Sequence, residues 1–387
     1  MKVRFIFLLI LVLPVALFAS GGRPPTTRPV QDEVRAIWVT RFDYQSQLDV
    51  SSIVVNCAKA GFTDIFFQVR GNGTAFYPSQ VEPWAFELFG KDVSKTGTNP
   101  GWDPLLIASS WAKRYNVRLH AYINVLPGWR GMSSPPRSAG QLWTAHPDWF
   151  MVDSMGTRMR PTSAWYSFVN PAHPAVRSHL SAIAAELSRY HIAGLHLDYI
   201  RFPYDYKDVA REVYPRASDA EILKRSTFSF DPVSRRAVGP NATRKDWDVF
   251  RRNAVTQVVK DLKSTFESRK GKGAIISASV LADFSIGYHK AFQDSRLWTR
   301  KNDVDWVIPM NYNAGLYNER LANIQNLIGR RASAKQLVVG INCAGDAQQI
   351  RRQIAVARNA GCRGFALFAY SHLFENHRPT AKAAVLR

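Results

Sequence analysis

The sequence predicts an α/β protein whose strands close into a (β/α)8 barrel of the TIM type. Eight short runs rich in β-branched and aromatic residues recur along the chain, and runs with helical apolar spacing separate them. Apolar strands that alternate with helices form a parallel sheet covered by helices. An open, doubly wound sheet is the alternative, but no Gly-x-Gly-x-x-Gly loop follows the first strand.

The N-terminal segment has the pattern of a secretory signal peptide. Lys2 and Arg4 precede an apolar run over 5–18, and small residues follow from Ala19. Because that run is too short to span a bilayer comfortably, we expect cleavage rather than a permanent anchor. Export to the periplasm or beyond is therefore expected, with membrane contact only through the signal peptide. The expected parts of the chain are a signal peptide at 1–20, a linker at 21–32 and a single barrel domain at 33–387.

Each predicted strand is a run in which β-branched, aromatic or other apolar residues predominate between turn-forming residues. The predicted strands are 34–40, 64–70, 118–125, 194–201, 274–281, 306–312, 337–342 and 364–370. Each predicted helix repeats apolar residues at the spacing i, i+3, i+4, which makes one face apolar. The predicted helices are 50–60, 104–115, 174–190, 246–268, 291–300, 319–330 and 347–359.

Three of the predicted connections from strand to helix are long. They follow the second, third and fourth strands, are rich in Trp, Tyr, Pro and Gly, and cover 71–103, 126–172 and 202–245. Enzymes with this fold build their sites from the loops at the carboxyl ends of the strands. Long aromatic loops at that end therefore predict a deep groove above the barrel.

Charge and ligand-forming residues restrict the classes of partner. The formal net charge is +21, which favours polyanions such as the acidic polymers of cell walls. Lys and Arg are spread along the chain without a helix-long basic stripe, so we expect no nucleic-acid partner. The nine His residues are scattered and show no zinc-ligand spacing, so neither a metal nor another cofactor is expected.

Asp198 is the strongest candidate for a catalytic residue. It stands near the end of the fourth predicted strand, between the apolar residues Leu197 and Ile200. A carboxylate embedded in such a run must be paired or hydrogen-bonded, or its pKa rises. Either outcome suits acid/base or nucleophilic work on a glycosidic bond. The alternative is a structural aspartate paired with Arg70 or Arg201.

Glycoside hydrolysis generally needs a second carboxylate close to the first. Asp283 has the best predicted position, just after the fifth strand, although its surroundings also suit a helix N-cap. Glu82 lies in the loop after the second strand, where it suits loop bracing equally well. The remaining candidates are Asp43 and Asp346.

Other polar and aromatic side chains near the strand ends are expected to bind substrate. Tyr77 and Trp84 are candidates for stacking on pyranose rings. The polar ones are expected to position the sugar and tune the carboxylates. The full set of expected substrate-binding residues is Gln68, Arg70, Tyr77, Trp84, His120, Asn124, His196, Arg201, Tyr312 and Asn342.

Several motifs in the same order resemble those of the glycosyl-hydrolase-like family ten, which includes an exported, division-associated peptidoglycan hydrolase of enteric bacteria. The motifs are EVRAIWVT at 33–40, FQVR at 67–70, AFYPS at 75–79, EPW at 82–84, PGWDPL at 100–105, HAYIN at 120–124 and GLHLDYIRFP at 194–203. The resemblance implies a TIM-type barrel that acts on glycan strands, including strands stripped of their peptides. Tyr199 stands where many members have a second Asp, so that residue's role is unfilled.

The sixth predicted strand ends in Met-Asn-Tyr-Asn at 310–313, which is similar to chitinase-type barrels. Those enzymes place a Glu where this chain has Ile200, so substrate assistance would lack its usual acid. The sequence as a whole predicts an exported glycoside hydrolase that cleaves peptidoglycan or another N-acetylhexosamine glycan, with Asp198 as general acid or nucleophile. Cell-wall or division proteins are further candidate partners. The alternative is a catalytically silent barrel that binds cell-wall glycan.

Overall fold

The computed structural model describes residues 33–271 and 273–386, and its centre is a closed barrel of eight parallel strands. The strands follow one another around the ring in chain order, and the last pairs with the first. They are β1 (Val34–Val39), β2 (Asp64–Arg70), β3 (Arg118–Asn124), β6 (Gly194–Asp198), β7 (Ile275–Leu281), β8 (Trp306–Met310), β9 (Val338–Asn342) and β10 (Gly364–Phe368). The predicted TIM-type barrel is confirmed. The predicted signal peptide and linker lie outside the described residues.

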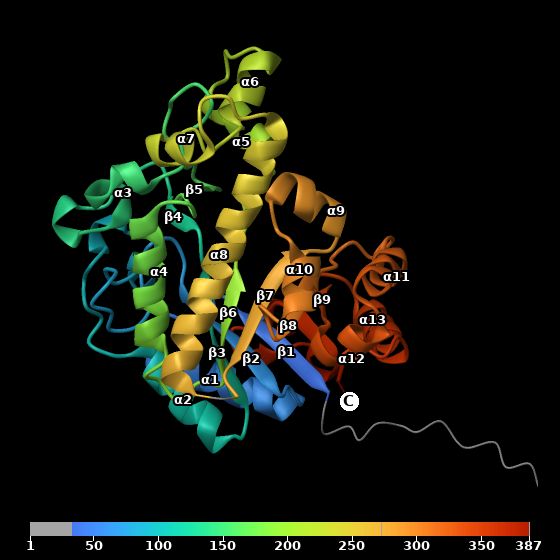
Figure 1. The fold of residues 1–387 in the computed structure, drawn as a ribbon. Coiled ribbons are helices and arrows are strands. Elements are labelled where there is room, and N and C mark those ends of the chain that lie inside the picture. Colours follow the sequence, from blue (N-terminus) through green and yellow to red (C-terminus); the bar gives the residue numbers. More distant parts are fainter. Residues whose placement is uncertain (1–32, 272, 387) are drawn as a thin grey trace, which may run out of the picture. The chain divides into compact units, whose positions relative to one another are not determined.

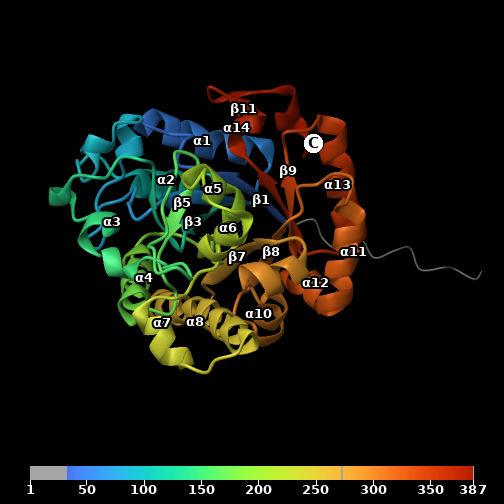
Figure 2. The ribbon, with the colours of Figure 1, turned by 90° about the horizontal axis from the view of Figure 1, so that it is seen from above.

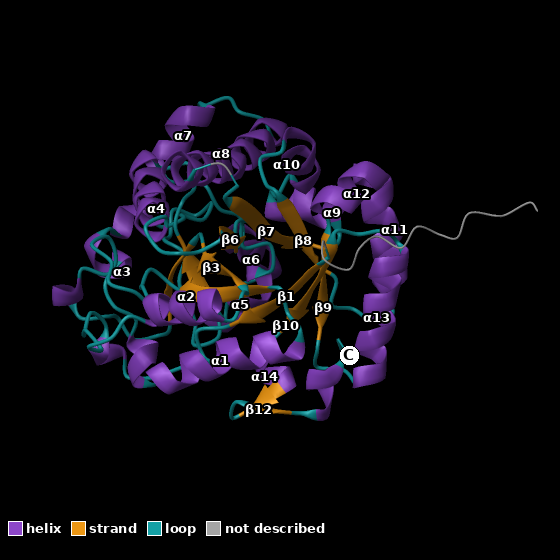
Figure 3. Cartoon of the chain, turned by 90° about the horizontal axis from the view of Figure 1, so that it is seen from below, coloured by secondary structure: helices purple, strands orange, loops and turns teal. Residues whose placement is uncertain are grey.

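Helices surround the strands in the views from above and below (Figure 2, Figure 3). The outer helices are α1 (Gln47–Ala60), α2 (Pro104–Arg114), α4 (Pro174–Leu187), α8 (Arg244–Lys270), α10 (Ser295–Lys301), α11 (Tyr317–Ile328), α12 (Arg330–Gln336), α13 (Ala347–Asn359) and α14 (Tyr370–Leu373). Local chemistry sets their ends. Helix α1 begins where the Ser46 hydroxyl accepts a bond from the Asp49 N–H, and it ends at Gly61, whose φ of +93° is left-handed.

Several predicted elements differ from the observed ones by a few residues at their ends, and two of them show the physical reason. The fourth predicted strand reached residue 201, whereas β6 ends at Asp198 because Tyr199 takes a left-handed φ of +50°. The predicted helix 291–300 begins later, at Ser295, because Asp294 is its N-cap and accepts a bond from the Leu297 N–H. The first of these differences shapes the candidate site.

The three long loops have structure of their own and rise above the carboxyl ends of the barrel strands (Figure 1). The loop after β3 contains the antiparallel pair β4 (Pro127–Arg130) and β5 (Tyr166–Phe168). The loop after β6 contains α5 (Tyr206–Val213), α6 (Asp219–Arg225) and α7 (Pro232–Val238). The predicted long loops therefore build a superstructure over the fourth strand, where Asp198 ends the barrel wall.

Side chains fill the barrel interior, so only its mouth can admit a ligand. An inner cluster that includes Trp38, Phe66, Tyr122, Trp306 and Ile308 is separate from the larger core between strands and helices. No helix in 33–271 or 273–386 combines the length and apolar composition needed to cross a membrane.

Candidate active site

Asp198 ends β6 at the barrel mouth and is only 7% exposed. Its Oδ2 accepts a hydrogen bond from the Tyr122 hydroxyl at 2.9 Å, and its Oδ1 accepts one from the Tyr199 N–H at 2.7 Å. The Arg201 Nη1 lies 3.7 Å from Oδ1, which is too long for a hydrogen bond. The Asp198 carboxylate therefore accepts two hydrogen bonds from neutral donors, and the Arg201 cation lies nearby without a hydrogen bond to it.

These contacts leave Asp198 with a perturbed affinity for protons. Burial raises the pKa of Asp198 above its ordinary value, and the charge of Arg201 and the bonds from Tyr199 and Tyr122 oppose that rise without cancelling it. A carboxyl group that keeps its proton to higher pH is suited to donate it to a leaving group. Raised pKa values of this kind are typical of catalytic acids.

The turn after β6 gives Asp198 its surroundings. Tyr199 is a non-glycine residue at φ +50°, a conformation that costs about 1 to 2 kcal/mol. This turn aims the Tyr199 N–H at Asp198 and places its ring 5.2 Å from Tyr166 and 4.4 Å from the Arg201 guanidinium carbon. Strain of this type is frequently held at functional sites, where the surrounding structure enforces it.

Asp205 is a second carboxylate that interacts with Arg201 and Tyr199, as Asp198 does, and sequence reasoning missed it. Burial raises the pKa of Asp205, the charge of Arg201 lowers it, and Asp205 in turn raises the pKa of Tyr199. Its Oδ1 and the Nη1 of Arg201 are buried with no hydrogen-bond partner among the described residues. Asp205 precedes α5 but makes no capping bond there. Its place in the same loop as Asp198 was the available signal.

Sequence reasoning also missed Tyr122 as a site residue, although Tyr122 lies between His120 and Asn124 on the same face of β3. Asn124 lies directly beside Asp198 in the strand register. Its amide donates to the Gly71 carbonyl at 3.0 Å, and its Oδ1 is buried without a partner among the described residues. The structure therefore brings this predicted substrate-binding residue to the site with an acceptor available.

Two other predicted residues, Gln68 and Tyr312, lie close to the carboxyl ends of β2 and β8. Gln68 pairs in register with Tyr122, and its Oε1 accepts the Arg41 N–H at 2.9 Å. Tyr312 is half-buried and stacks on Phe368 with ring centroids 5.5 Å apart. Burial raises the pKa of Tyr312, and the charge of Asp198 contributes to the rise. These contacts place Gln68 and Tyr312 around Asp198.

The contacts of Asn342 and Trp84 are local ones, made away from Asp198. Asn342 ends β9, and its Oδ1 accepts the Ala344 N–H at 2.8 Å, which forms a local turn. Trp84 is half-buried in the loop after β2 and packs on the main hydrophobic core. These contacts do not involve Asp198, so the predicted roles of both residues in binding stay predictions.

Glu82 and Arg70 pair with each other in a buried cluster, an arrangement that favours a structural role over their predicted catalytic and binding roles. Arg70 is 0% exposed and binds Glu82 in a bidentate pair, with bonds of 2.9 and 2.7 Å. His179 makes a third contact with Glu82 at 2.9 Å. Burial opposes ionisation of Glu82, but the Arg70 charge and the His179 bond lower its pKa to about 2. Such a carboxylate does not carry a proton at neutral pH.

The two predicted histidines are also structural. The Nε2 of His196 accepts the Trp38 indole N–H at 2.9 Å, so Nδ1 is the protonated nitrogen that donates to Ser277 at 2.8 Å. Burial keeps the pKa of His196 well below its usual value, so the ring is neutral inside the barrel, two residues beneath Asp198. His120 is fully buried deeper in the barrel, 2.8 Å from Asp64.

Tyr77 and Asp283 have local tasks as well. Tyr77 is buried under the loop after β2, and its hydroxyl donates to Glu186 at 3.2 Å, so the ring offers no stacking surface. Asp283 is the N-cap of the short helix α9 (Phe284–Ile286) and accepts the N–H groups of Ser285 and Ile286 at 2.9 and 3.0 Å. The alternative of a helix N-cap, which the sequence also allowed, accounts for this carboxylate.

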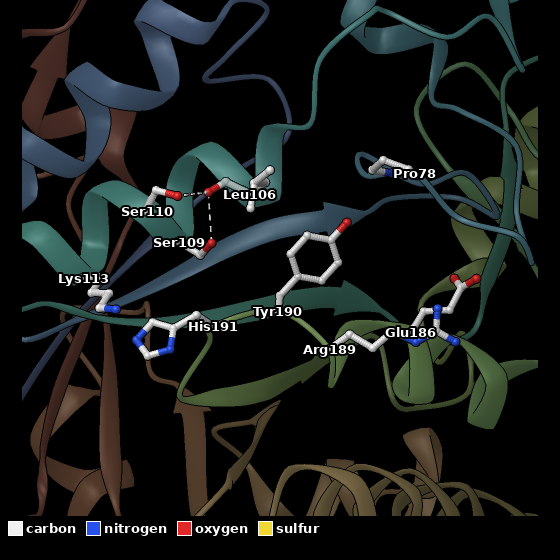
Figure 4. Close-up of a pocket in the computed structure, with 9 residues that line it drawn as sticks. All are labelled: Pro78, Leu106, Ser109, Ser110, Lys113, Glu186, Arg189, Tyr190 and His191. Carbon is white, nitrogen blue, oxygen red and sulfur yellow. Dashed lines mark hydrogen bonds between the residues drawn. The ribbon is translucent and has the colours of Figure 1, made fainter.

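One cavity on the far side of the barrel does not mark the site. It measures about 510 Å3 and lies between α2 and the end of α4 (Figure 4). Its residues Arg189, Tyr190 and His191 precede β6, so they stand at the end of that strand opposite Asp198. Sites in this fold form at the carboxyl ends of strands, which favours Asp198. Across the described residues, no group of three or more His, Cys, Asp or Glu is arranged to hold a metal ion.

Comparison with known proteins agrees with the motifs and the fold. A family model described as "Glycosyl hydrolase-like 10" matches residues 33–358. The chain belongs to this family. The resemblance that the motifs predicted is thereby confirmed, and the matched region covers every barrel strand except β10.

Two proteins with similar sequences are named as glycosyl hydrolases. "Glycosyl hydrolase DigH" of Escherichia coli K12 is 25% identical over 336 residues, which cover 76% of this chain and 69% of that protein. "Glycosyl hydrolase YngK" of Bacillus subtilis is 24% identical over 308 residues, which cover 72% of this chain and 54% of that protein.

The solved structures confirm the fold. The catalytic domain of β-amylase from Paenibacillus polymyxa matches with a TM-score of 0.54 and 10% identity, over 92% of this chain and 97% of that one. At that identity the likeness concerns the barrel alone. The protein is therefore a TIM-barrel member of a glycosyl hydrolase-like family.

Proposed function

We propose that this protein is an exported glycoside hydrolase that cleaves glycosidic bonds in a bacterial cell-wall glycan. The observation that carries the proposal is Asp198, a buried carboxyl group with a raised pKa at the mouth of a barrel of this family. Membership of a glycosyl hydrolase-like family supports the bond type. The net charge of +21 supports an anionic wall polymer, and the signal-like pattern of 1–20 supports export.

In the proposed reaction Asp198 is the general acid. Its proton passes to the glycosidic oxygen as the bond between that oxygen and the anomeric carbon breaks. Tyr122 and Arg201 then stabilise the carboxylate that remains, because one donates to Oδ2 and the other is a cation 3.7 Å from Oδ1. The water that completes hydrolysis returns a proton to Asp198 directly when Asp198 also acts as the base, and otherwise gives it to the second carboxylate, in which case Asp198 is reprotonated from solvent.

We propose Asp205 as the second carboxylate, in place of Glu82 and Asp283. It flanks Arg201, and one of its oxygens is buried without a partner among the described residues. As a base it would deprotonate the attacking water and invert the anomeric centre, and as a nucleophile it would form a glycosyl ester and retain it. The anomeric form of the first product, followed by NMR, distinguishes the two routes.

The test is release of soluble fragments from purified sacculi. We expect Asp198→Asn to lower turnover by about a thousandfold or more, since the proton donor is lost. Asp283→Asn is the matched control and should keep turnover within about threefold. Melting temperatures of both variants establish that they fold. Unchanged turnover in Asp198→Asn would remove this residue from the chemistry.

A second function is favoured by one observation: all four carboxylates that the sequence offered as partners of Asp198 are engaged in local structure. A barrel that has lost its second carboxylate would bind glycan without cleaving it. Sedimentation with insoluble peptidoglycan, run beside the turnover assay, separates these functions. Binding with no turnover in the unmodified protein would favour the silent barrel.

A further inference from the structure

A groove of about 450 Å3 opens in the superstructure beside Asp198. One wall is the loop after β6, and the other is formed by the start of α8 and the π-helical turn Gly287–Ala291. The Phe202 N–H joins the two walls through a 2.9 Å bond to the Ala291 carbonyl. The groove is therefore built on the same loop that carries Arg201 and Asp205.

Tyr204 connects the lining of the groove with Arg201 of the candidate site. This residue lines the groove and is 38% exposed, and its ring centroid lies 5.9 Å from the Arg201 guanidinium carbon. A polymer whose one bond lies against Asp198 and Arg201 would extend next over Tyr204.

The lining of the groove suits the face of a sugar ring. Tyr204 and Leu223, which is 60% exposed, present apolar surface to solvent. Phe230 and Trp247 pack against each other with centroids 4.9 Å apart and form part of the lining, with Trp247 half-buried. Aromatic and apolar side chains of this kind bind the C–H faces of pyranose rings.

The charge of the lining is positive. Arg244 at the start of α8 and Lys290 on the π-helical turn are both exposed, and neither has an ion-pair partner in the part of the chain that the structure describes. The acid in the lining, Asp248, is already bound to Arg251 at 3.1 Å. Arg251 is itself buried and donates to the Phe228 carbonyl at 2.9 Å. Two cations therefore remain available to a ligand.

We propose that this groove binds the part of the glycan strand beyond the cleaved bond, and that Arg244 and Lys290 recognise carboxylate substituents on its sugars. The proposal rests on the proposed action on a cell-wall glycan and names the feature of the strand that is read. A hexosamine with an ether-linked carboxylic acid fits both the apolar lining and the cationic rim. A neutral N-acetylglucosamine polymer fits only the lining.

The test measures binding in the full chain with Asp198→Asn, so that no strand is cleaved. The probes are soluble glycan strands freed of peptide, the same strands with their carboxylates reduced to alcohols, and chitohexaose. We expect the double variant Arg244→Ala, Lys290→Ala to bind the carboxylate strands about tenfold more weakly. Its affinity for the two neutral probes should change by less than about twofold.

Lys245→Ala is the matched control, because Lys245 is an exposed cation on the same turn of α8 that does not line the groove. It should leave all three affinities within about twofold. An equal loss with Lys245→Ala, or an equal loss of the double variant on the reduced strands, would overturn the proposal. Since these are binding measurements, they decide it even if the unmodified protein cleaves no glycan, which would contradict the proposed function alone.

Discussion

Glu82 and Asp198 are both buried carboxylates beside an arginine, yet the structure shifts their pKa values in opposite directions. The two oxygens of Glu82 bind Arg70 at 2.7 and 2.9 Å, and His179 adds a contact at 2.9 Å. The nearest guanidinium nitrogen to Asp198 is 3.7 Å away, and its hydrogen bonds come from a tyrosine hydroxyl and a backbone N–H. Pairing overcomes burial for Glu82, whereas burial prevails for Asp198.

The difference separates stability from chemistry. A carboxylate that is fully paired stays ionised and holds structure together, because breaking a buried pair leaves an uncompensated charge. Glu82 in this way ties the loop after β2 to Arg70 on that strand and to His179 on α4. A carboxyl group that is incompletely paired keeps its proton and can give it away. The same residue type, arginine, is present in both regions, so the distance and geometry of its contact decide which behaviour results.

The largest expected effect is a loss of stability when the Glu82–Arg70 pair is broken. Glu82→Gln should lower the free energy of unfolding by about 3 kcal/mol at pH 7, because Arg70 is left buried without its partner. Urea denaturation measures this loss. The kcat of the folded variant should stay within about threefold of the unmodified protein, and a large loss of kcat at full stability would return Glu82 to the catalytic candidates.

This stability loss should depend on pH in a defined direction. The pKa of Glu82 is about 2 in the folded chain against an ordinary value of 4.5, so its stabilising contribution is present above 4.5 and disappears as the pH falls toward 2. The gap in unfolding free energy between the unmodified protein and Glu82→Gln should therefore close across that range. A gap that persists at pH 2 would contradict the ion-pair account.

The second largest effect is expected from Asp205→Asn, in the region around Asp198 where the carboxylates are incompletely paired. We expect kcat to fall by about a hundredfold, since the second carboxylate is lost, while the unfolding free energy changes little. Asp208→Asn, an exposed neighbour on α5, is the control and should leave kcat unchanged. If Asp205→Asn keeps full activity, another residue must serve as partner of Asp198.

Asp198→Asn should stabilise the protein at neutral pH. The folded pKa of Asp198 is raised, so the folded state holds a proton that the unfolded state releases, and stability falls as pH rises through that range. Removing the charge removes this cost, and a gain of about 1 kcal/mol is the usual size for an active-site residue. Thermal denaturation should show the gain at pH 7 and none below pH of about 3. Destabilisation at pH 7 would indicate a structural aspartate.

Tyr122→Phe should give the smallest effect. The Tyr122 hydroxyl favours the ionised form of Asp198, so its removal raises the pKa of that carboxyl group further. The alkaline limb of the kcat profile should move to higher pH, with a loss at the optimum of less than about tenfold. An unmoved limb would mean that Asp198 is not the group titrating there.

The sequence by itself determined the architecture and the position of Asp198. Apolar runs at strand length and helical spacing are local signals, and they placed β6 and its terminal carboxylate correctly because a parallel barrel buries both faces of each strand. The motifs around Asp198 also sufficed to indicate the family. The end of β6 was harder, because the left-handed turn at Tyr199 breaks the local rule for a bulky residue.

Only the tertiary structure decided which partner each polar residue meets. His196 looked available for a ligand until the barrel brought Trp38 to its Nε2, a contact across 158 positions of sequence. Arg70 met Glu82 and not Asp198, while Arg201 was left between Asp198 and Asp205. Strand register and loop conformation set these pairings through long-range packing. Since a carboxylate is structural or reactive according to its nearest donors, that distinction is absent from the local sequence.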